Sequence, residues 1–208
     1  TIERLLGRGG MGEVWLASRS DGRFEGLCAL KFLERSVAQP KLEERFRHEG
    51  RLLGRLTHPN IARLLDAGTL DGRQYLVLEY VDGEPIDRYC ESRNLSIDER
   101  LELFARTCDA VAHAHGKQIV HRDIKPDNLF ITNDDRVKIL DFGLAKLTQP
   151  SNDSTAQTDI ATRKVHTNPG AVMGTAGYLS PEQVRAAPLD HRSDIFSFGA
   201  VLYEMLSG

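Results

Sequence analysis

The apolar residues of the first 80 positions fall mostly in short runs separated by glycine-containing turns. Runs of this kind are typical of β-strands, and the Asp21-Gly22 and Asp71-Gly72 steps are typical of the turns between them. One longer segment shows helical spacing instead. The pattern therefore predicts strands at 3–7, 13–18, 28–33, 63–67 and 75–80 and a helix at 41–56.

The predicted helix carries an acidic residue on its apolar side. Glu49 falls on the same stripe as the apolar side chains. The apolar members of that stripe are Leu42, Phe46, Leu53 and Leu56. A carboxylate on the inward face of a helix is unfavourable unless a cation meets it. The pattern therefore predicts a basic partner for Glu49.

The character of the chain changes after residues 81–85, a segment that contains glycine and proline. Ser96 and Glu99 have the spacing of a capping box, so a helix should begin there. A hairpin is predicted from strands at 129–131 and 137–140, and a buried helix at 193–206. A strand-rich first part followed by a helix-rich second part indicates an α+β fold.

Composition and charge are those of an ordinary globular protein. Of 208 residues, 27% are charged and 40% hydrophobic, and the formal net charge is -3. This charge gives no reason to expect nucleic acid or an anionic membrane as a partner, and no apolar run could span a bilayer. Cys28, Cys90 and Cys108 have unpatterned spacings and are expected to be reduced packing residues in the cytoplasm. His113 and His115 are expected to be packing or surface groups, because no metal-ligand spacing is present.

Two motifs in the second part carry most of the candidate chemistry. The first is HRDIKPDN, from His121 to Asn128, and the second is Asp141-Phe142-Gly143. They place two acids, a lysine and an amide on neighbouring loops. Such groups suit the binding of magnesium and a triphosphate while a hydroxyl is aimed at the terminal phosphorus. A surface loop with scattered charges would not account for two such motifs at this separation.

Both motifs resemble the signature of the protein kinase family. The resemblance implies that Asp123 accepts the proton of the substrate hydroxyl and that Lys125 stabilises the transferred phosphoryl group. It also implies that Asn128 and Asp141 bind Mg²⁺ next to ATP.

The resemblance extends into the first part of the chain. Lys31 matches the strand lysine that grips the α- and β-phosphates, and Glu49 matches the helix glutamate that pairs with it. Four further residues would stack as a spine between two lobes, anchored by Asp194. They are Leu53, Leu64, His121 and Phe142. The details are most similar to bacterial eukaryotic-like (Hanks-type) serine/threonine kinases.

The Gly-x-Gly-x-x-Gly pattern of Gly7, Gly9 and Gly12 occurs in two kinds of nucleotide site. A helix follows these glycines in a dinucleotide-binding fold, whereas a strand follows them in a kinase. Residues 14–17 favour a strand, with an NAD-binding module and a plain hairpin turn as alternatives. By the resemblance, the nucleotide site consists of Leu6, Gly7, Gly9, Gly10, Gly12, Val14, Ala29, Lys31, Leu78, Glu79, Val81 and Phe130.

The long polar stretch between Asp141 and Glu182 resembles the activation segment of kinases. An arginine directly before the catalytic base, here Arg122, would bind a phosphate on that segment. Thr167 is the expected acceptor, because of its position shortly before Gly174. Thr175 and Glu182 match the loop that docks the substrate.

The resemblance implies one bilobal kinase domain over residues 1–208, with an N-lobe at 1–80, a hinge at 81–84 and a partial C-lobe at 85–208. The C-lobe is expected to be incomplete, which would leave Glu182 without the arginine that pairs with it in the family. The implied function is ATP-dependent phosphorylation of serine and threonine on proteins, with autophosphorylation by two associated copies. The implied location is the cytoplasm, with or without a membrane anchor elsewhere. A non-catalytic pseudokinase is the alternative.

Overall fold

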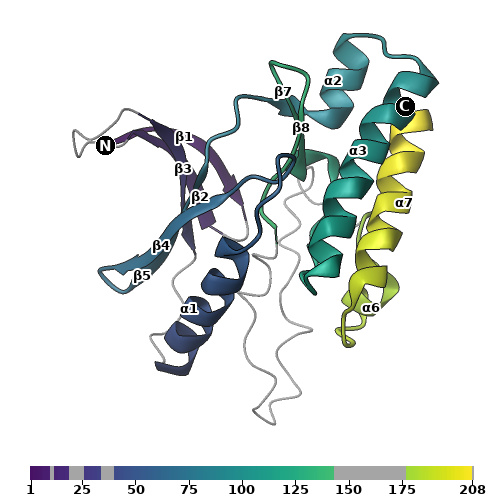
Figure 1. Ribbon diagram of the computed structural model, residues 1–208. Helices are drawn as coiled ribbons and strands as arrows, with labels where there is room; N and C mark the ends of the chain where they lie inside the picture. The colour runs from purple at the N-terminus through teal and green to yellow at the C-terminus, as the bar shows by residue number, and fades with distance from the viewer. Residues whose placement is uncertain (10–11, 19–25, 34–39, 143–176, 208) are drawn as a thin grey trace, which may run out of the picture.

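The computed structural model describes residues 1–9, 12–18, 26–33, 40–142 and 177–207. Its first part is a five-stranded antiparallel sheet in the order β1-β2-β3-β5-β4 (Figure 1). The strands are β1 (Ile2–Gly9), β2 (Gly12–Ser18), β3 (Leu27–Leu33), β4 (Leu64–Leu70) and β5 (Arg73–Glu79). All five predicted strands are confirmed, and every pair of neighbouring strands in this sheet is antiparallel.

Helix α1 (Pro40–Gly54) lies against this sheet (Figure 1). Its apolar residues Phe46 and Leu53 join a core cluster with residues of β3 and β5. The predicted helix is confirmed, but it ends at Gly54, a poor helix former, and not at Leu56. Leu56 consequently packs in the other core of the molecule. We call the five-stranded sheet with α1 the N-lobe.

A second sheet has the order β6-β7-β8 and contains β6 (Gly83–Pro85), β7 (Leu129–Thr132) and β8 (Val137–Ile139). The hairpin of β7 and β8 was predicted. Strand β6 was not, because it is only three residues long and contains a glycine and a proline, which disfavour a strand without β7 beside them. A Cβ at Gly83 would lie 2.2 Å from the carbonyl oxygen of Ile131, so only glycine permits this close pairing.

Helices α2 (Ile86–Ser92) and α3 (Ile97–Gly116) pack against this second sheet, and α7 (His191–Ser207) packs on α3 (Figure 1). These helices and the sheet form the C-lobe. The predicted capping box at the start of α3 is confirmed, since Ser96 and Glu99 exchange side-chain and backbone hydrogen bonds. Helix α7 packs one face against α3, where Phe198 meets Phe104 edge-to-face at 5.4 Å. The expectation that the whole helix is buried is wrong, because Ile195, Phe196 and Tyr203 on its other side are exposed. The short helices α2 and α6 (Pro181–Val184) were not predicted.

Contacts between strand ends join the two lobes. Ile61, just before β4, forms a β-bridge with Ile139 of β8. The carboxylate of Glu79 at the end of β5 accepts a 2.5 Å ion-pair contact from Lys138 of β8. The α+β architecture with two lobes is thus confirmed, whereas the exact limits 1–80, 81–84 and 85–208 stay a prediction.

Two further expectations can be compared with the fold. All three cysteines are free, and Cys90 is buried, as expected of packing residues. Within the described ranges, no helix is both long and apolar enough to cross a membrane.

Candidate functional site

The loop between α3 and β7 gathers three of the predicted catalytic residues. The amide of Asn128 donates to the backbone oxygen of Asp123 at 2.6 Å and to its Oδ2 at 3.0 Å. The ammonium group of Lys125 lies 3.2 Å from the same Oδ2. A 3-10 turn, η1 (Pro126–Asn128), makes this possible because it folds the chain back towards Asp123. The sequence correctly predicted that these residues lie together.

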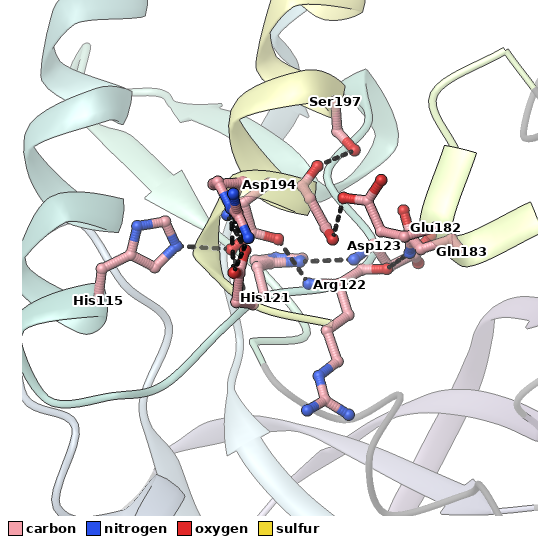
Figure 2. A network of polar contacts seen from close by, with 11 residues as sticks. His115, His121, Arg122, Asp123, Glu182, Gln183, Asp194 and Ser197 are labelled. Atoms are coloured by element: carbon pink, nitrogen blue, oxygen red, sulfur yellow. Dashed lines mark hydrogen bonds and ion pairs between the residues drawn. The ribbon is translucent and has the colours of Figure 1, made fainter. Parts of the chain in front are cut away.

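The backbone that leads into Asp123 is held by a carboxylate from another helix (Figure 2). Asp194 of α7 accepts the N–H groups of His121 and Arg122, each at 2.8 Å. The ring of His115 on α3 lies 2.7 Å from the same carboxylate. His115 was expected to be a packing or surface group, and that expectation is incomplete, because its ring is a hydrogen-bond partner of a buried acid.

The environment of Asp194 favours its charged form. Its burial alone would raise the pKa of the carboxyl group, since a charge is poorly solvated in the interior. The hydrogen bond from His115, the nearby ring of His121 and the two backbone N–H groups outweigh that effect. The pKa of Asp194 is therefore held below its ordinary value.

His121 connects the catalytic loop to the second motif. Its Nδ1 accepts the N–H of Asp123 at 3.2 Å, and its Nε2 donates to the Leu140 carbonyl at 2.9 Å. The ring also packs edge-on against Phe142, with centroids 4.6 Å apart. The predicted spine is confirmed at His121, Phe142 and Asp194. Its other two members, Leu53 and Leu64, lie in the core of the N-lobe.

Asp141 forms an ion pair with Lys31, and the pair joins the C-lobe to β3 of the N-lobe. The ammonium nitrogen and the carboxylate Oδ2 are 2.5 Å apart, and Lys31 is only 4% exposed. A buried ammonium requires such a partner. Asp141 also has φ +57°, a left-handed conformation that is unusual for a residue other than glycine. Glu49 is half-buried on α1, and its pairing with Lys31 stays a prediction.

The remaining N-lobe candidates lie on one face of the sheet. Val14 is paired with Lys31, and Ala29 with Leu78. Residues directly opposite each other share a face, as do residues two apart on one strand. All four side chains therefore lie on the same face of the sheet. Gly7 of the neighbouring strand β1 is paired with Val14.

The glycines of the Gly-x-Gly-x-x-Gly pattern differ in whether a side chain could replace them. Gly12 has φ +126°, and a Cβ there would lie 1.9 Å from the Phe32 carbonyl oxygen, so β2 can pair with β3 only with glycine at this position. Gly7 and Gly9 have open space at the Cβ position, which leaves room for a ligand beside the backbone. Gly10 lies outside the described residues. Strand β2, and not a helix, follows Gly12, which excludes the dinucleotide-binding alternative.

Two cavities lie near these elements. The smaller, of about 330 Å³, is lined by segment 79–82 and the β7–β8 hairpin, and it includes Glu79 and Val81 from the predicted nucleotide site. The larger, of about 560 Å³, lies between α1 and β4 and is lined by none of the residues predicted for the nucleotide site. Leu6 is 36% exposed on β1, and Phe130 is half-buried on β7.

The docking side of the site rests on α7. Glu182 was expected to lack the arginine that pairs with it in the family, and the structure shows the Ser193 hydroxyl donating to it at 2.7 Å. That hydrogen bond is the main cause that lowers the pKa of Glu182. The Tyr178 hydroxyl donates to Glu204, and burial together with this bond raises the pKa of Tyr178. Thr167 and Thr175 lie outside the described residues.

The side chains at the two motifs have the chemistry that Mg²⁺ requires. Asn128 uses its Nδ2 for Asp123, so its Oδ1 can serve as a ligand together with the carboxylate of Asp141. Magnesium prefers such hard oxygen ligands and fills its other positions with water and phosphate oxygens. Within the described part of the chain, no group of three or more histidine, cysteine and acidic side chains could hold a metal. The site therefore fits magnesium with a nucleotide and not an all-protein metal cage.

Gln183 also contacts the loop that carries Asp123, and the sequence did not predict this contact. Its Nε2 donates to the Arg122 carbonyl at 2.7 Å, next to Asp123 (Figure 2). The spacing of Ser180 and Gln183 is that of a capping box and could have indicated the start of α6. Nothing local in the sequence indicates the contact with Arg122.

Comparisons with known proteins place this geometry in a family. The family model of the protein kinase domain matches residues 1–208. The serine/threonine-protein kinases pkn3 and pkn2 of Myxococcus xanthus are 35% and 39% identical to the chain, and PknB of Mycobacterium tuberculosis is 39% identical. All of the chain is covered in each case, but it spans only 37%, 24% and 32% of these relatives. The crystal structure of the Mycobacterium tuberculosis PknI kinase domain is similar with a TM-score of 0.70 at 30% identity, over 99% of this chain and 73% of that one.

Replacement of Asp194 should weaken the fold in a pH-dependent way. Asp194→Asn removes a charged acceptor from two backbone N–H groups, and we expect the free energy of unfolding at neutral pH to fall by about 3 kcal/mol. Because the pKa of Asp194 is lowered in the folded state, its contribution is present above about pH 4 and is lost as the pH falls further. Urea denaturation across this range should show the variant and the wild type converging at low pH.

The exposed Asp109 of α3 provides the control, since Asp109→Asn makes the same change in charge away from the loop. A constant difference between Asp194→Asn and wild type at all pH values would contradict the assigned role.

Proposed function

The chain belongs to the protein kinase family, and on this basis we propose that it transfers the terminal phosphoryl group of ATP to serine or threonine hydroxyls of proteins. The observation that carries the proposal is the convergence of Lys125 and Asn128 on one carboxylate oxygen of Asp123. Relatives such as pkn3 and PknB are serine/threonine-protein kinases, which supports the acceptor class. Phosphoryl transfer depends on such positioning and charge neutralisation more than on covalent chemistry.

Asp123 would receive the acceptor hydroxyl. Its contacts with Lys125 and Asn128 both reach Oδ2, so Oδ1 can point to the hydroxyl and accept its proton. Lys125, beside this oxygen, would then compensate the negative charge of the transferring group. One carboxylate thus orients the nucleophile, and the adjacent cation stabilises the group that it attacks.

The Lys31–Asp141 ion pair marks the position of the phosphates. Each partner has a natural alternative when Mg-ATP binds: the ammonium group to the phosphates, and the carboxylate to magnesium together with Asn128. Bound magnesium would supply neutralisation of the phosphate charge. Until then the two side chains satisfy each other at 2.5 Å.

The nucleoside would lie against the sheet face that carries Val14, Ala29 and Leu78. These are small or apolar side chains, which suits a flat adenine ring. The backbone of Glu79 to Val81 would supply its hydrogen bonds, with Leu6 and Phe130 on either side. The glycines at 7, 9, 10 and 12 would cover the phosphates.

Regulation would pass through Arg122, whose guanidinium group points away from the buried network in Figure 2. A phosphate on Thr167 would give this cation a bidentate partner and order the segment before Thr175. Autophosphorylation would require two copies of the chain to associate. The free cysteines fit a reducing compartment, and we propose a cytoplasmic location.

Asp123→Asn should separate turnover from binding. Magnesium-dependent phosphate transfer from labelled ATP to a generic basic protein is expected to fall roughly 100-fold or more, because the base acts in the transition state. The dissociation constant for ATP should stay nearly unchanged. Asp109→Asn is the control for the loss of one negative charge. Near-normal turnover of Asp123→Asn would remove Asp123 from this role, and an inactive but ATP-binding wild type would favour the pseudokinase alternative.

Asp141→Ala should remove the effect of magnesium on nucleotide affinity. Without this carboxylate one of two protein ligands of the metal is lost. Isothermal titration calorimetry with and without magnesium should therefore give similar dissociation constants for the variant and different ones for the wild type. Asp109→Ala should behave as wild type. If the magnesium effect persists in Asp141→Ala, the metal assignment is wrong.

Activity should rise on phosphorylation of Thr167, because the new charge would pair with Arg122. Mass spectrometry after incubation with ATP is expected to find phosphate at Thr167, and Thr167→Ala should slow turnover. Thr158→Ala, in the same polar stretch, is the matched control. Full activity of Thr167→Ala, or an active sample without phosphate at Thr167, would refute the regulatory assignment.

A further inference from the structure

The residue before the proposed catalytic base has an unfavourable backbone conformation. Arg122 has φ +72°, which lies in the left-handed region. A side chain with a Cβ pays of order 1–2 kcal/mol there, so surrounding contacts must hold it in place. The two torsions of Arg122 also set the direction in which the chain enters Asp123. Whatever fixes them fixes the position of the base.

The peptide groups on both sides of Arg122 are held by side chains from other elements (Figure 2). Its N–H donates to Oδ1 of Asp194 at 2.8 Å, which fixes the preceding peptide group. Its carbonyl accepts Nε2 of Gln183 at 2.7 Å, which fixes the following one, shared with Asp123. Because φ and ψ of one residue relate its two peptide groups, these two bonds together determine the conformation of Arg122.

The Gln183 amide can present only its nitrogen to Arg122. Its Oε1 accepts the backbone N–H of Ser180 at 3.0 Å, in the capping box that begins α6. An N–H requires an oxygen acceptor and a carbonyl requires a donor, so both partners demand the same orientation of the amide. The buried Ser180 hydroxyl completes the box by accepting the Gln183 N–H.

Helix α6 is itself attached to the helix that carries Asp194. The Ser193 hydroxyl of α7 donates to Glu182, and the Ser197 hydroxyl donates to the Tyr178 carbonyl just before α6. Helix α7 therefore holds both side chains that contact Arg122: it carries Asp194, and it is hydrogen-bonded to the segment that carries Gln183. A change in the docking segment would reach Asp123 through a single amide.

We infer that Gln183 is a positioning residue for Asp123, which couples the docking segment around α6 to the catalytic loop through the Arg122 carbonyl. The inference rests on the proposed function, because it assigns Gln183 a part in that reaction. Gln183 touches no reacting atom and acts only through the backbone of Arg122.

Gln183→Glu is the sharpest test, because it removes the donor and keeps the cap. Glutamate retains an oxygen for the Ser180 N–H, as in an ordinary capping box, but its ionised carboxylate would repel the Arg122 carbonyl. We expect kcat to fall about 10- to 100-fold, with the KM for ATP within about 2-fold and the melting temperature within about 2 °C of wild type. Gln74→Glu on β5 makes the same chemical change outside the network and should have no effect.

Two further readouts distinguish positioning from general destabilisation. Once protonated, the carboxyl group introduced by Gln183→Glu would again donate to the carbonyl, so the ratio of variant to wild-type kcat should rise as the pH is lowered from about 8 to about 5.5. Amide hydrogen exchange in residues 121–125 should accelerate in the variant, while the amides of α3 stay unchanged.

Each outcome decides the inference. A kcat within about 2-fold of wild type with unchanged exchange overturns it. A loss of kcat that accompanies a lower melting temperature, without recovery at low pH, also overturns it and leaves Gln183 a structural role only. If folded wild-type protein transfers no phosphate and Asp123→Asn is indistinguishable from it, the proposed function fails. In that case the exchange measurement still shows whether Gln183 holds the loop.

Discussion

The catalytic loop depends on one buried carboxylate, that of Asp194. The acid and the loop depend on each other: the two backbone N–H groups and His115 stabilise the charge, and without the carboxylate these donors would lose their acceptor. The acid reaches this position because one face of α7 is buried, with Val201 and Met205 in the C-lobe core. Hydrophobic packing thus holds α7 in place, and the hydrogen bonds of Asp194 then fix the backbone of the loop.

Strain and support occur together at both functional motifs. The two residues with left-handed backbone that matter for the site are Arg122, directly before the proposed base, and Asp141, a proposed magnesium ligand. Each is held by groups far away in sequence: Arg122 by Asp194 and Gln183, and Asp141 by Lys31. Such conformations persist only where surrounding contacts outweigh their cost. We therefore regard the positions of both motifs as consequences of tertiary packing, and not of the local sequence.

The sequence predicted the features that are local. Strands and helices followed from the spacing of apolar residues, and the capping box at Ser96 marked the start of α3 correctly. Asp123, Lys125 and Asn128 lie within six positions, so their motif alone predicted that they meet. Strand β6 and the Lys31–Asp141 ion pair were missed, because each exists only when a distant partner is already in place. The hydrogen bond from Ser193 to Glu182 was missed for the same reason, since the two residues lie eleven positions apart.

Gln183 shows how a local and a distant signal combine. Its spacing from Ser180 is a capping box of the kind that predicted α3, so α6 was detectable from the sequence. In the same capping box, the Ser180 N–H donates to the side-chain oxygen of Gln183, so only the amide nitrogen is left for a further partner. The partner, the Arg122 carbonyl, is brought there by Asp194 and the packing of α7. A helix cap thus orients a donor, and tertiary packing decides that the donor meets the backbone of the catalytic loop. The same side chain therefore belongs both to the fold and, on the function proposed for this chain, to its chemistry.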